Sequence, residues 1–348
     1  MITLLAFPLA WLGSIFQRAR NEQATIEWVE EKGGSVTFGE GWIDRWIANT
    51  VRKVTLSNKE VTDLSPLAKL RNLKSLDLWS TRVTDLSSLV ELNNLEYLDL
   101  GDTQVQDLSP LAKLVSLEGL GLADTQAKDL SPVGELTNLV RLELGGAKTS
   151  DFSPLKKLLN LKELYLYSTR VSDLTPLQGL RSLETLSLYE TRVSDLAPLA
   201  GLKSIKELRL GKTSVSKLSP LSQLASLEEL HLRETQVGDV SPLAGLKNLT
   251  DLDLVNTQVN DIRPLAGLKN LETLQLTGSQ VSEEQVKVLR QALPNCDIMF
   301  SVEEVKAWTP EVDPALREKA HFQIQVPAAF LKDEPEQIEI RWIDFYRG

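Results

Sequence analysis

Apolar residues recur at fixed spacing along most of this chain. In the segment Asn94–Val115, which reads NLEYLDLGDTQVQDLSPLAKLV, they fall at Leu95, Leu98 and Leu100. Alternation with polar residues around Leu98 predicts a short strand from which Tyr97 faces outward. Four further apolar residues return to the core at wider spacing: Val105, Leu108, Leu111 and Leu114. The segment therefore predicts one strand and one turn on a common core.

This apolar frame repeats every 22 residues without insertion or deletion. Eleven copies begin at Thr50, Asn72, Asn94, Ser116, Asn138, Asn160, Ser182, Ser204, Ser226, Asn248 and Asn270. A fixed period with L-x-x-L-x-L spacing is typical of a leucine-rich solenoid, whose units are stable only when stacked. We predict an α/β solenoid: a right-handed leucine-rich repeat array with a parallel concave β-sheet, short helical or 3-10 turns on the convex side, and a cap at each end.

Two polar rows follow the same period, and we interpret both as structural. The first is a threonine after each strand, replaced once by Ala147: Thr81, Thr103, Thr125, Thr169, Thr191, Thr213, Thr235 and Thr257. Its hydroxyl is expected to bond the backbone of the following bend. The second row is Asp-Leu-Ser-Pro-Leu, as at Asp107–Leu111. Here Ser109 is expected to cap a helical turn that tolerates the missing N–H of Pro110.

The N-terminal part contains two predicted segments. Residues 2–16 are apolar and uncharged, and Arg18 and Arg20 follow them. They are fewer than the roughly 20 residues of a spanning helix, and they match a signal peptide poorly. They are a candidate membrane attachment that would leave the repeats in the cytoplasm; the alternatives are a helix packed on the cap and a start codon assigned too late.

A cap is predicted between this segment and the repeats. We expect a helix over Ala24–Lys32 that ends at Gly33, and then a strand over Ser35–Phe38. An apolar helical face is expected from Trp42, Ile43, Trp46 and Ile47. Such a cap would cover the open edge of the first repeat.

The repeat unit resembles a known class. The sequence NLxxLxLxxTxVxDLSPLAxL, read from Asn72, Asn94 and Asn248, resembles the 22-residue internalin-type leucine-rich repeat of bacterial proteins. Val281–Ile298 is similar to the longer helix and closing strand that end such arrays. The resemblance implies a protein-recognition fold used by adhesins, adaptors and regulators alike. Beyond Met299 the period ends, and alternating apolar residues predict two terminal strands, in an extended C-terminal cap or a separate partner-binding tail: Phe322, Ile324 and Val326, then Ile338, Ile340 and Trp342.

The predicted organisation has four parts: residues 1–23, an apolar segment and linker; 24–49, the N-terminal cap; 50–291, eleven repeats; and 292–348, the C-terminal cap and tail. The net charge of −10 disfavours nucleic acid as partner, because binding phosphates requires a basic face. The single Cys296 excludes an internal disulfide framework. With only His231 and His321 and no phosphate-binding loop, we expect neither an enzyme nor a cofactor or metal.

The candidate site consists of variable residues at outward strand positions. Nine are large or charged: Trp79, Tyr97, Arg141, Tyr165, Tyr167, Tyr189, Arg209, His231 and Arg233. Tyrosine and arginine are enriched in interface hot spots. Small residues near them, such as Gly119 and Gly145, are expected to admit a partner's backbone. The alternative is that tyrosines only suit strands, and that binding uses the aspartates or the tail.

The function expected is a non-enzymatic scaffold or adaptor that binds a basic or neutral protein on the concave face. We expect a monomer in the cytoplasm or on the inner face of the membrane. One alternative is an exported or surface-attached internalin-like adhesin, and another is a hydrolase-like site on the concave face.

Overall fold

The computed structural model of the protein describes residues 22–39 and 50–300, which fall into two compact units. The first contains the described residues up to Val171 together with Thr175–Leu183, and the second contains Ser172–Leu174 and the residues from Glu184 onward. The predictions for residues 2–16, for the Trp42 face and for the strands beyond Met299 lie outside the described residues. Within the described part, no helix has both the length and the apolar composition needed to cross a bilayer.

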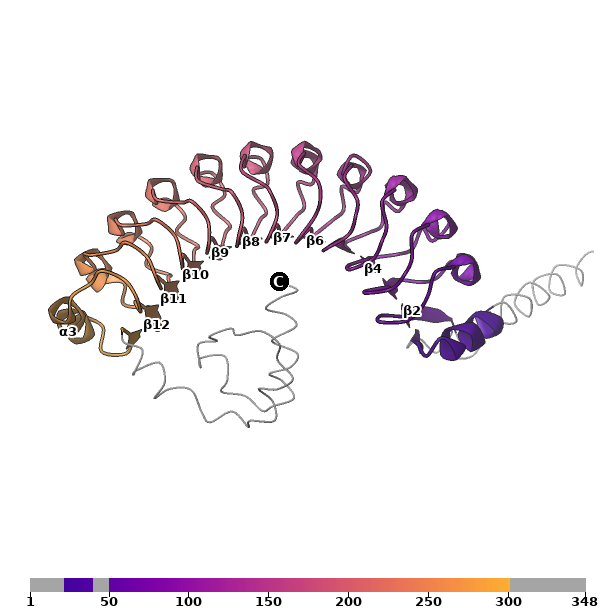
Figure 1. Ribbon diagram of the computed structural model, residues 1–348, viewed down its shortest axis with the longest axis horizontal. Helices are drawn as coiled ribbons and strands as arrows, with labels where there is room; N and C mark the ends of the chain where they lie inside the picture. The colour runs from indigo at the N-terminus through magenta and orange to yellow at the C-terminus, as the bar shows by residue number, and fades with distance from the viewer. Residues whose placement is uncertain (1–21, 40–49, 301–348) are drawn as a thin grey trace, which may run out of the picture. The chain divides into compact units, whose positions relative to one another are not determined.

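The first unit is a stack of short strands in sequence order (Figure 1). Strand β1 (Ser35–Phe38) pairs antiparallel with β2 (Val51–Thr55). The parallel strands that follow are β3 (Ser75–Asp77), β4 (Tyr97–Asp99), β5 (Gly119–Gly121), β6 (Arg141–Glu143) and β7 (Glu163–Tyr165). Each is followed by a 3-10 turn; together with the turn after β2 these are η1 (Ser65–Lys69), η2 (Ser87–Leu89), η3 (Ser109–Lys113), η4 (Val133–Glu135), η5 (Ser153–Lys157) and η6 (Thr175–Leu177).

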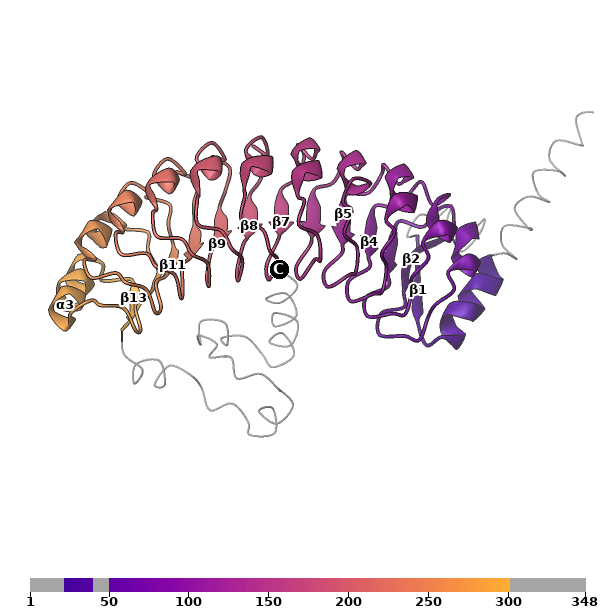
Figure 2. The same ribbon diagram turned by 45° about the horizontal axis from the view of Figure 1, so that its top comes forward.

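The second unit continues the same pattern and ends in a helix and a strand (Figure 2). Its parallel strands are β8 (Thr185–Ser187), β9 (Glu207–Arg209), β10 (Glu229–His231), β11 (Asp251–Asp253), β12 (Thr273–Gln275) and β13 (Asp297–Met299). Its turns are η7 (Ala197–Leu199), η8 (Ser219–Leu221), η9 (Ser241–Leu243) and η10 (Arg263–Gly267). Helix α3 (Glu283–Ala292) packs against η10, so the predicted closing helix and strand are confirmed.

The period of the sequence produces this stack because it places the same residue type at the same height in each repeat. Leu98 of β4 lies opposite Leu76 of β3 and Leu120 of β5, and all three are buried. Strands line one side of each unit and 3-10 turns the other. The predicted leucine-rich repeat solenoid, with its open parallel sheet, is confirmed.

The residue at the bend after each strand adopts a left-handed backbone, which we did not predict. Nine such residues are not glycine: Asn58, Ser80, Asp102, Asp124, Ser168, Glu190, Lys212, Glu234 and Asn256. Gly146 and Gly278 occupy the same position in two other repeats. A positive φ is disfavoured for residues with a Cβ. The neighbouring backbone holds it in place, because Asp102 N–H donates to the Ala123 carbonyl at 2.8 Å.

The threonine row forms the predicted bonds. Thr103 is buried, and its Oγ1 donates to the carbonyl of Leu100 at 2.6 Å. The equivalent bond recurs in the other threonine repeats, as from Thr235 to Leu232 at 2.6 Å. The threonines therefore act as backbone partners at the end of each strand.

The role predicted for the serine of Asp-Leu-Ser-Pro is wrong. Ser109 is the first residue of η3, and the residue before it, Leu108, makes no side-chain capping bond. Instead Asp107 accepts from the Ser109 backbone N–H at 2.8 Å and from its hydroxyl at 2.9 Å. The aspartate is two residues before the turn and has a charged acceptor, so it satisfies the free N–H better than a serine hydroxyl could.

The N-terminal cap agrees with the prediction where it is described. A helix covers residues 22–31, with Ile26 and Val29 buried. Gly33 follows at a φ of 73°, which is the left-handed conformation that ends many helices. Thr25 donates from Oγ1 to the Pro66 carbonyl at 2.9 Å, so the helix is attached to the first turn of the array.

Candidate binding surface on the strand faces

Aromatic rings of the first unit lie on glycines of the adjacent repeat. A Cβ built on Gly101 would collide with the Trp79 ring, and one on Gly119 with the Tyr97 ring. Gly145 has the same relation to Tyr167. We expected Gly119 and Gly145 to admit a partner's backbone, and that interpretation is wrong for both. Each glycine instead provides the space in which a ring from the neighbouring repeat lies.

This arrangement leaves aromatic surface facing outward. Tyr97 is 50% exposed, while Trp79 and Tyr167 are half-buried. A ring supported by backbone has fewer conformations to lose on binding than one extending freely into solvent. The three rings are the part of the predicted site that is both accessible and held in place.

Arg141 organises a charged cluster in the same unit. Its guanidinium pairs with Glu143 and, at 2.5 Å, with Glu163, and its carbon Cζ lies 4.7 Å from the centre of the Tyr165 ring. The Tyr165 hydroxyl donates to Glu163 Oε2 at 3.1 Å. Burial would lower the pKa of Arg141, but the charge and hydrogen bond of Glu143 raise it above its ordinary value. Arg141 is therefore held as a cation.

Tyr165 differs from the other predicted aromatic residues because it is only 6% exposed. Its ring face is against Arg141 and its hydroxyl is bonded within the molecule. We infer that Tyr165 positions Arg141 and Glu163. The sequence signal for this cluster is the opposite charge at Arg141 and Glu143, two residues apart on one strand face.

Tyr189 belongs to the second unit, and its surroundings differ from those of the first-unit rings. Lys212 Nζ lies 5.2 Å from the centre of the Tyr189 ring. The ring also lies beside Gly211, where a Cβ would come within 3.0 Å of it and within 2.8 Å of the Arg233 side chain. Here a tyrosine and an arginine share the space above one glycine.

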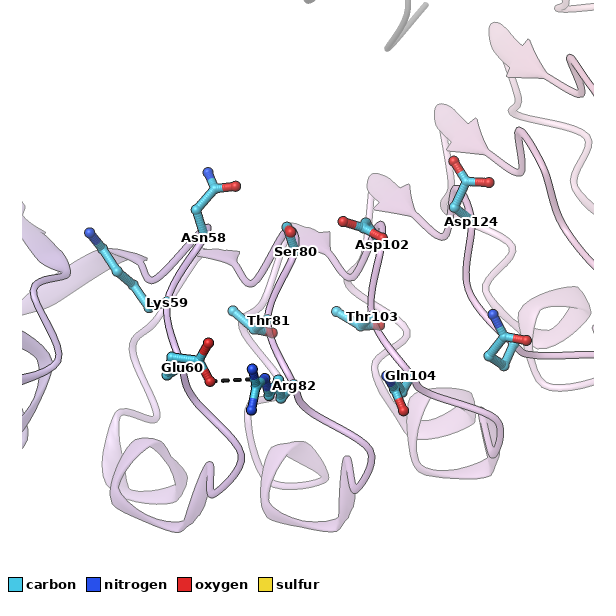
Figure 3. A pocket seen from close by; sticks show the side chains of 11 residues that line it. Asn58, Lys59, Glu60, Ser80, Thr81, Arg82, Asp102, Thr103, Gln104 and Asp124 are labelled. Carbon is cyan, nitrogen blue, oxygen red and sulfur yellow. Dashed lines mark ion pairs between the residues drawn. The ribbon is translucent and has the colours of Figure 1, made fainter.

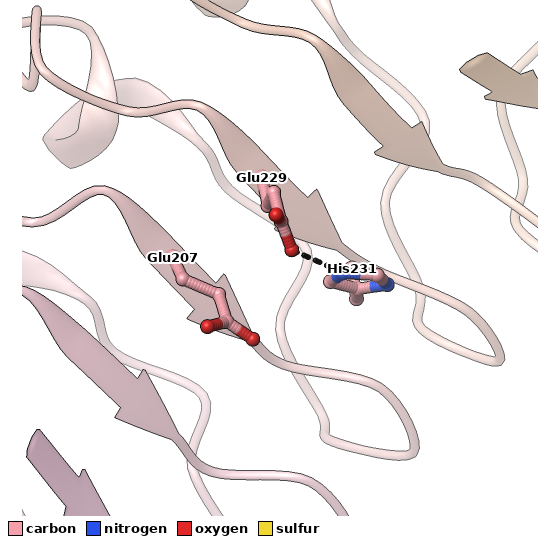
Figure 4. A group of neighbouring side chains, drawn as sticks. All are labelled: Glu207, Glu229 and His231. Carbon is pink, nitrogen blue, oxygen red and sulfur yellow. Dashed lines mark ion pairs between the residues drawn. The ribbon is translucent and has the colours of Figure 1, made fainter. Parts of the chain in front are cut away.

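A second charged cluster lies on β9 and β10 (Figure 4). Arg209 Nε is 2.5 Å from Glu207 Oε1, and His231 Nε2 is 3.8 Å from Glu229 Oε2. Burial would lower the pKa of His231, but neighbouring carboxylates, Glu229 first, raise it above the usual value for imidazole. Arg209 opposes them only in part. Arg209 and His231, which we predicted as partner contacts, thus lie here beside the carboxylates of Glu207 and Glu229.

Strand β11 adds two carboxylates that our list of candidate residues omitted. Burial raises the pKa of Asp251 to about 6, although the charge of His231 lowers it. Asp253 is buried and accepts from the Val255 N–H at 2.9 Å. Both occupy outward positions opposite Glu229 and His231 in the parallel register. In the sequence, Asp251 follows Glu229 by 22 residues and Asp253 follows His231 by 22 residues. This spacing of one repeat was the signal that could have placed them together.

A polar pocket of about 560 Å³ lies along the bends that follow the strands of the first unit (Figure 3). It is lined by the left-handed residues Asn58, Ser80, Asp102 and Asp124 and by seven polar neighbours. Glu60 and Arg82 form an ion pair of 2.8 Å at its wall. Burial raises the pKa of Asp124, with Lys148 opposing and Asp102 adding to the shift.

Comparison with known proteins agrees with this fold. Residues 50–326 match the family model described as a leucine-rich repeat region, and the chain belongs to that family. No curated protein sequence matches the chain.

Two bacterial structures are similar over most of their length. An internalin, inlF, from Listeria monocytogenes is 29% identical, with 72% of this chain and 80% of that chain covered and a TM-score of 0.63. A leucine-rich repeat protein of Leptospira interrogans is 25% identical, with 72% of each chain covered and the same TM-score. The repeats are therefore of the internalin type, as their sequence indicated.

Proposed function

We propose that this protein is a non-enzymatic scaffold that binds a protein partner on the strand face of the first unit. Leucine-rich repeat domains serve generally as protein interaction scaffolds, and this chain has that fold. The observation that carries the proposal is the set of rings of Trp79, Tyr97 and Tyr167, which are supported on glycines.

The chemistry of these rings suits a protein partner. Tyrosine and tryptophan contribute large contact areas and a hydrogen-bonding tip, and they are enriched in hot spots. Asp77 and Asp99 lie on the same strand face, within a chain of net charge −10. A partner with basic or neutral contact residues fits this face best.

The polar residues support a role without catalysis. Those that recur with the repeat are used by the backbone, the threonines at strand ends and the aspartates before the 3-10 turns. The Arg141 cluster pairs its charges internally. We propose that it provides a rigid border to the aromatic surface.

The proposal is tested by photo-crosslinking from single positions. A benzoyl-phenylalanine at Tyr97 should give a specific adduct in cells that make the native partner. The control is the same group at Val115, which follows η3 in the same unit and is similarly exposed, 54% against 50%. Adducts of equal yield from both positions, or from Val115 alone, would contradict binding on the strand face.

A double variant tests the energetic contribution of the rings. Trp79→Ala with Tyr97→Ala should weaken binding of the crosslinked partner at least about tenfold, as expected for hot-spot residues. Circular dichroism should remain unchanged, because both residues lie outside the leucine core. Undiminished binding by a folded double variant would reject the rings as the contact surface.

The similarity to inlF favours a second candidate, an internalin-like adhesin at the cell surface. It differs from the first in location, since the scaffold is proposed for the cytoplasm. Protease treatment of intact cells separates them, because only a surface protein is degraded without lysis.

A further inference from the structure

The cluster on β9 and β10 combines the donor groups of a metal site. One ligand atom each from Glu207, Glu229 and His231 lies within 4.8 Å of the other two. The register places Glu207 beside Glu229, and His231 follows on the same face two residues later. The backbone ladder, and not a flexible loop, therefore brings the three side chains together.

We propose that Glu207, Glu229 and His231 bind a divalent transition-metal ion, for which Zn²⁺ is the expected occupant. Imidazole nitrogen and carboxylate oxygen are both zinc ligands, and three protein ligands are the number found in open zinc sites. The fourth position would then hold water or a group from a partner. The site goes beyond the proposed function, because the aromatic surface is in the other unit.

The imidazole of His231 supports the assignment independently of the carboxylates. Its Nε2 is buried and has no hydrogen-bond partner among the described residues. Glu229 Oε2 at 3.8 Å is too far for a hydrogen bond. It is a suitable separation for two ligands of one ion, because bonds of roughly 2.0 to 2.2 Å place ligand atoms about 3 to 4 Å apart.

The surrounding charges also favour a cation. Asp251 and Asp253 lie on the adjacent strand opposite Glu229 and His231, and Asp251 Oδ1 is buried without a hydrogen-bond partner. The positive charges of Arg209 and Arg233 repel a metal cation, so the cluster favours a cation only if its carboxylates carry more charge than the two arginines. The ionised carboxylates of Glu207, Glu229, Asp251 and Asp253 carry four negative charges and the two arginines carry two positive ones. The cluster then has a net charge of −2 when His231 is neutral.

Arg209 has a positioning role in this arrangement. Its Nε lies 2.5 Å from one oxygen of Glu207. A carboxylate has two oxygens, so Glu207 can keep Arg209 on one and offer the other to the metal. A metal ion can reach the three ligands from solvent, because the side chain of Glu229 is 49% exposed.

The chain allows a sharp test, since it contains two histidines and one cysteine. Tag-free full-length protein is titrated with Zn²⁺ by calorimetry, and binding of one equivalent is expected. Glu229→Gln and Glu207→Gln preserve shape and should each weaken binding at least about tenfold. The matched controls, His321→Ala and Cys296→Ser, should leave the affinity unchanged.

The imidazole nitrogens of His231 provide a readout that needs no variant at this residue. In ¹⁵N NMR of the wild type, one equivalent of Zn²⁺ should shift the nitrogens of His231 and not those of His321. Absence of micromolar binding would overturn the proposal. So would binding that is unchanged in both glutamine variants, or an effect confined to His321 or Cys296.

Discussion

Aspartate side chains are used in two opposite ways in this chain. Those before the 3-10 turns are exposed and accept hydrogen bonds from the turn, which lowers the pKa of Asp63, Asp85, Asp129, Asp151, Asp239 and Asp261. Desolvation by the surrounding protein instead raises the pKa of Asp124, Asp251 and Asp253. The surroundings of each carboxylate, and not its residue type, decide the direction.

The exposed aspartates predict acid sensitivity. Hydrogen bonds and charge from Arg263 lower the pKa of Asp261 to about 2, below the value of about 3.9 in an unfolded chain. Its contribution to stability is therefore complete above about pH 4 and is lost as the pH falls toward 2. Asp261→Asn should make the free energy of unfolding less dependent on pH across this window, as measured by urea denaturation.

Asp124 is a control for Asp261, because its ionisation is expected to change stability in the opposite direction. Because burial raises its pKa, ionisation of Asp124 lowers stability as the pH rises above its unfolded value. Asp124→Asn should remove that decline and leave the acid loss below pH 4 in place. Identical pH profiles for both variants would contradict the assigned roles.

The bend after each strand is the element on which the repeats depend most closely. It needs a residue with positive φ, and most repeats fill it with a polar residue and not with glycine. Ladder bonds between adjacent bends, such as Ser80 N–H to the Gly101 carbonyl at 2.8 Å, impose the conformation. Strain at one bend is therefore offset by hydrogen bonds to the next.

Glycine holds the left-handed conformation at two of the described bends, Gly146 and Gly278, and Gly146 allows a direct test of the strain. Its φ is 65°, and a Cβ there would collide with the Asp124 carboxylate. Gly146→Ala should lower the free energy of unfolding by about 1 to 2 kcal/mol. The control is Gly201→Ala, where a Cβ meets nothing within 4 Å and the effect should stay within about 0.5 kcal/mol. Equal thermal shifts in the two variants would reject the explanation.

Each unit as a whole behaves as a series of interchangeable layers. The parallel pairs from β2 to β7 and from β8 to β12 join residues 22 positions apart, as Leu208 with Leu230 and Leu230 with Leu252. Stability in such a series comes from each repeat and from its contacts with its neighbours. The length of the array should then be adjustable only in whole periods.

Deletion tests this at the scale of the whole molecule. Removing Ser204–Ala225 deletes one period and joins Lys203 to Ser226, so Leu186 can pair with Leu230. This variant should keep the native circular dichroism spectrum and unfold cooperatively at a somewhat lower temperature. Removing only residues 204–214 places the leucines out of register, and it should abolish cooperative unfolding of the second unit. Similar melting of the two variants would contradict independent layers.

The sequence by itself determined the strand positions, the parallel order within each unit, the leucine core and the threonine bonds. It could do so because each depends on a contact that recurs with the period, and any one repeat reports it. The closing helix and strand were predictable for a related reason, since the period stops at them.

Only the tertiary structure decided which outward residues are accessible and what they contact. Trp79 lies on Gly101, Tyr165 is covered by Arg141, and His231 meets Glu229 and Glu207. These contacts depend on side-chain conformation across two strands, which neither repeat specifies alone. The left-handed bends were missed for a similar reason, because polar residues there are held by backbone bonds from the next repeat.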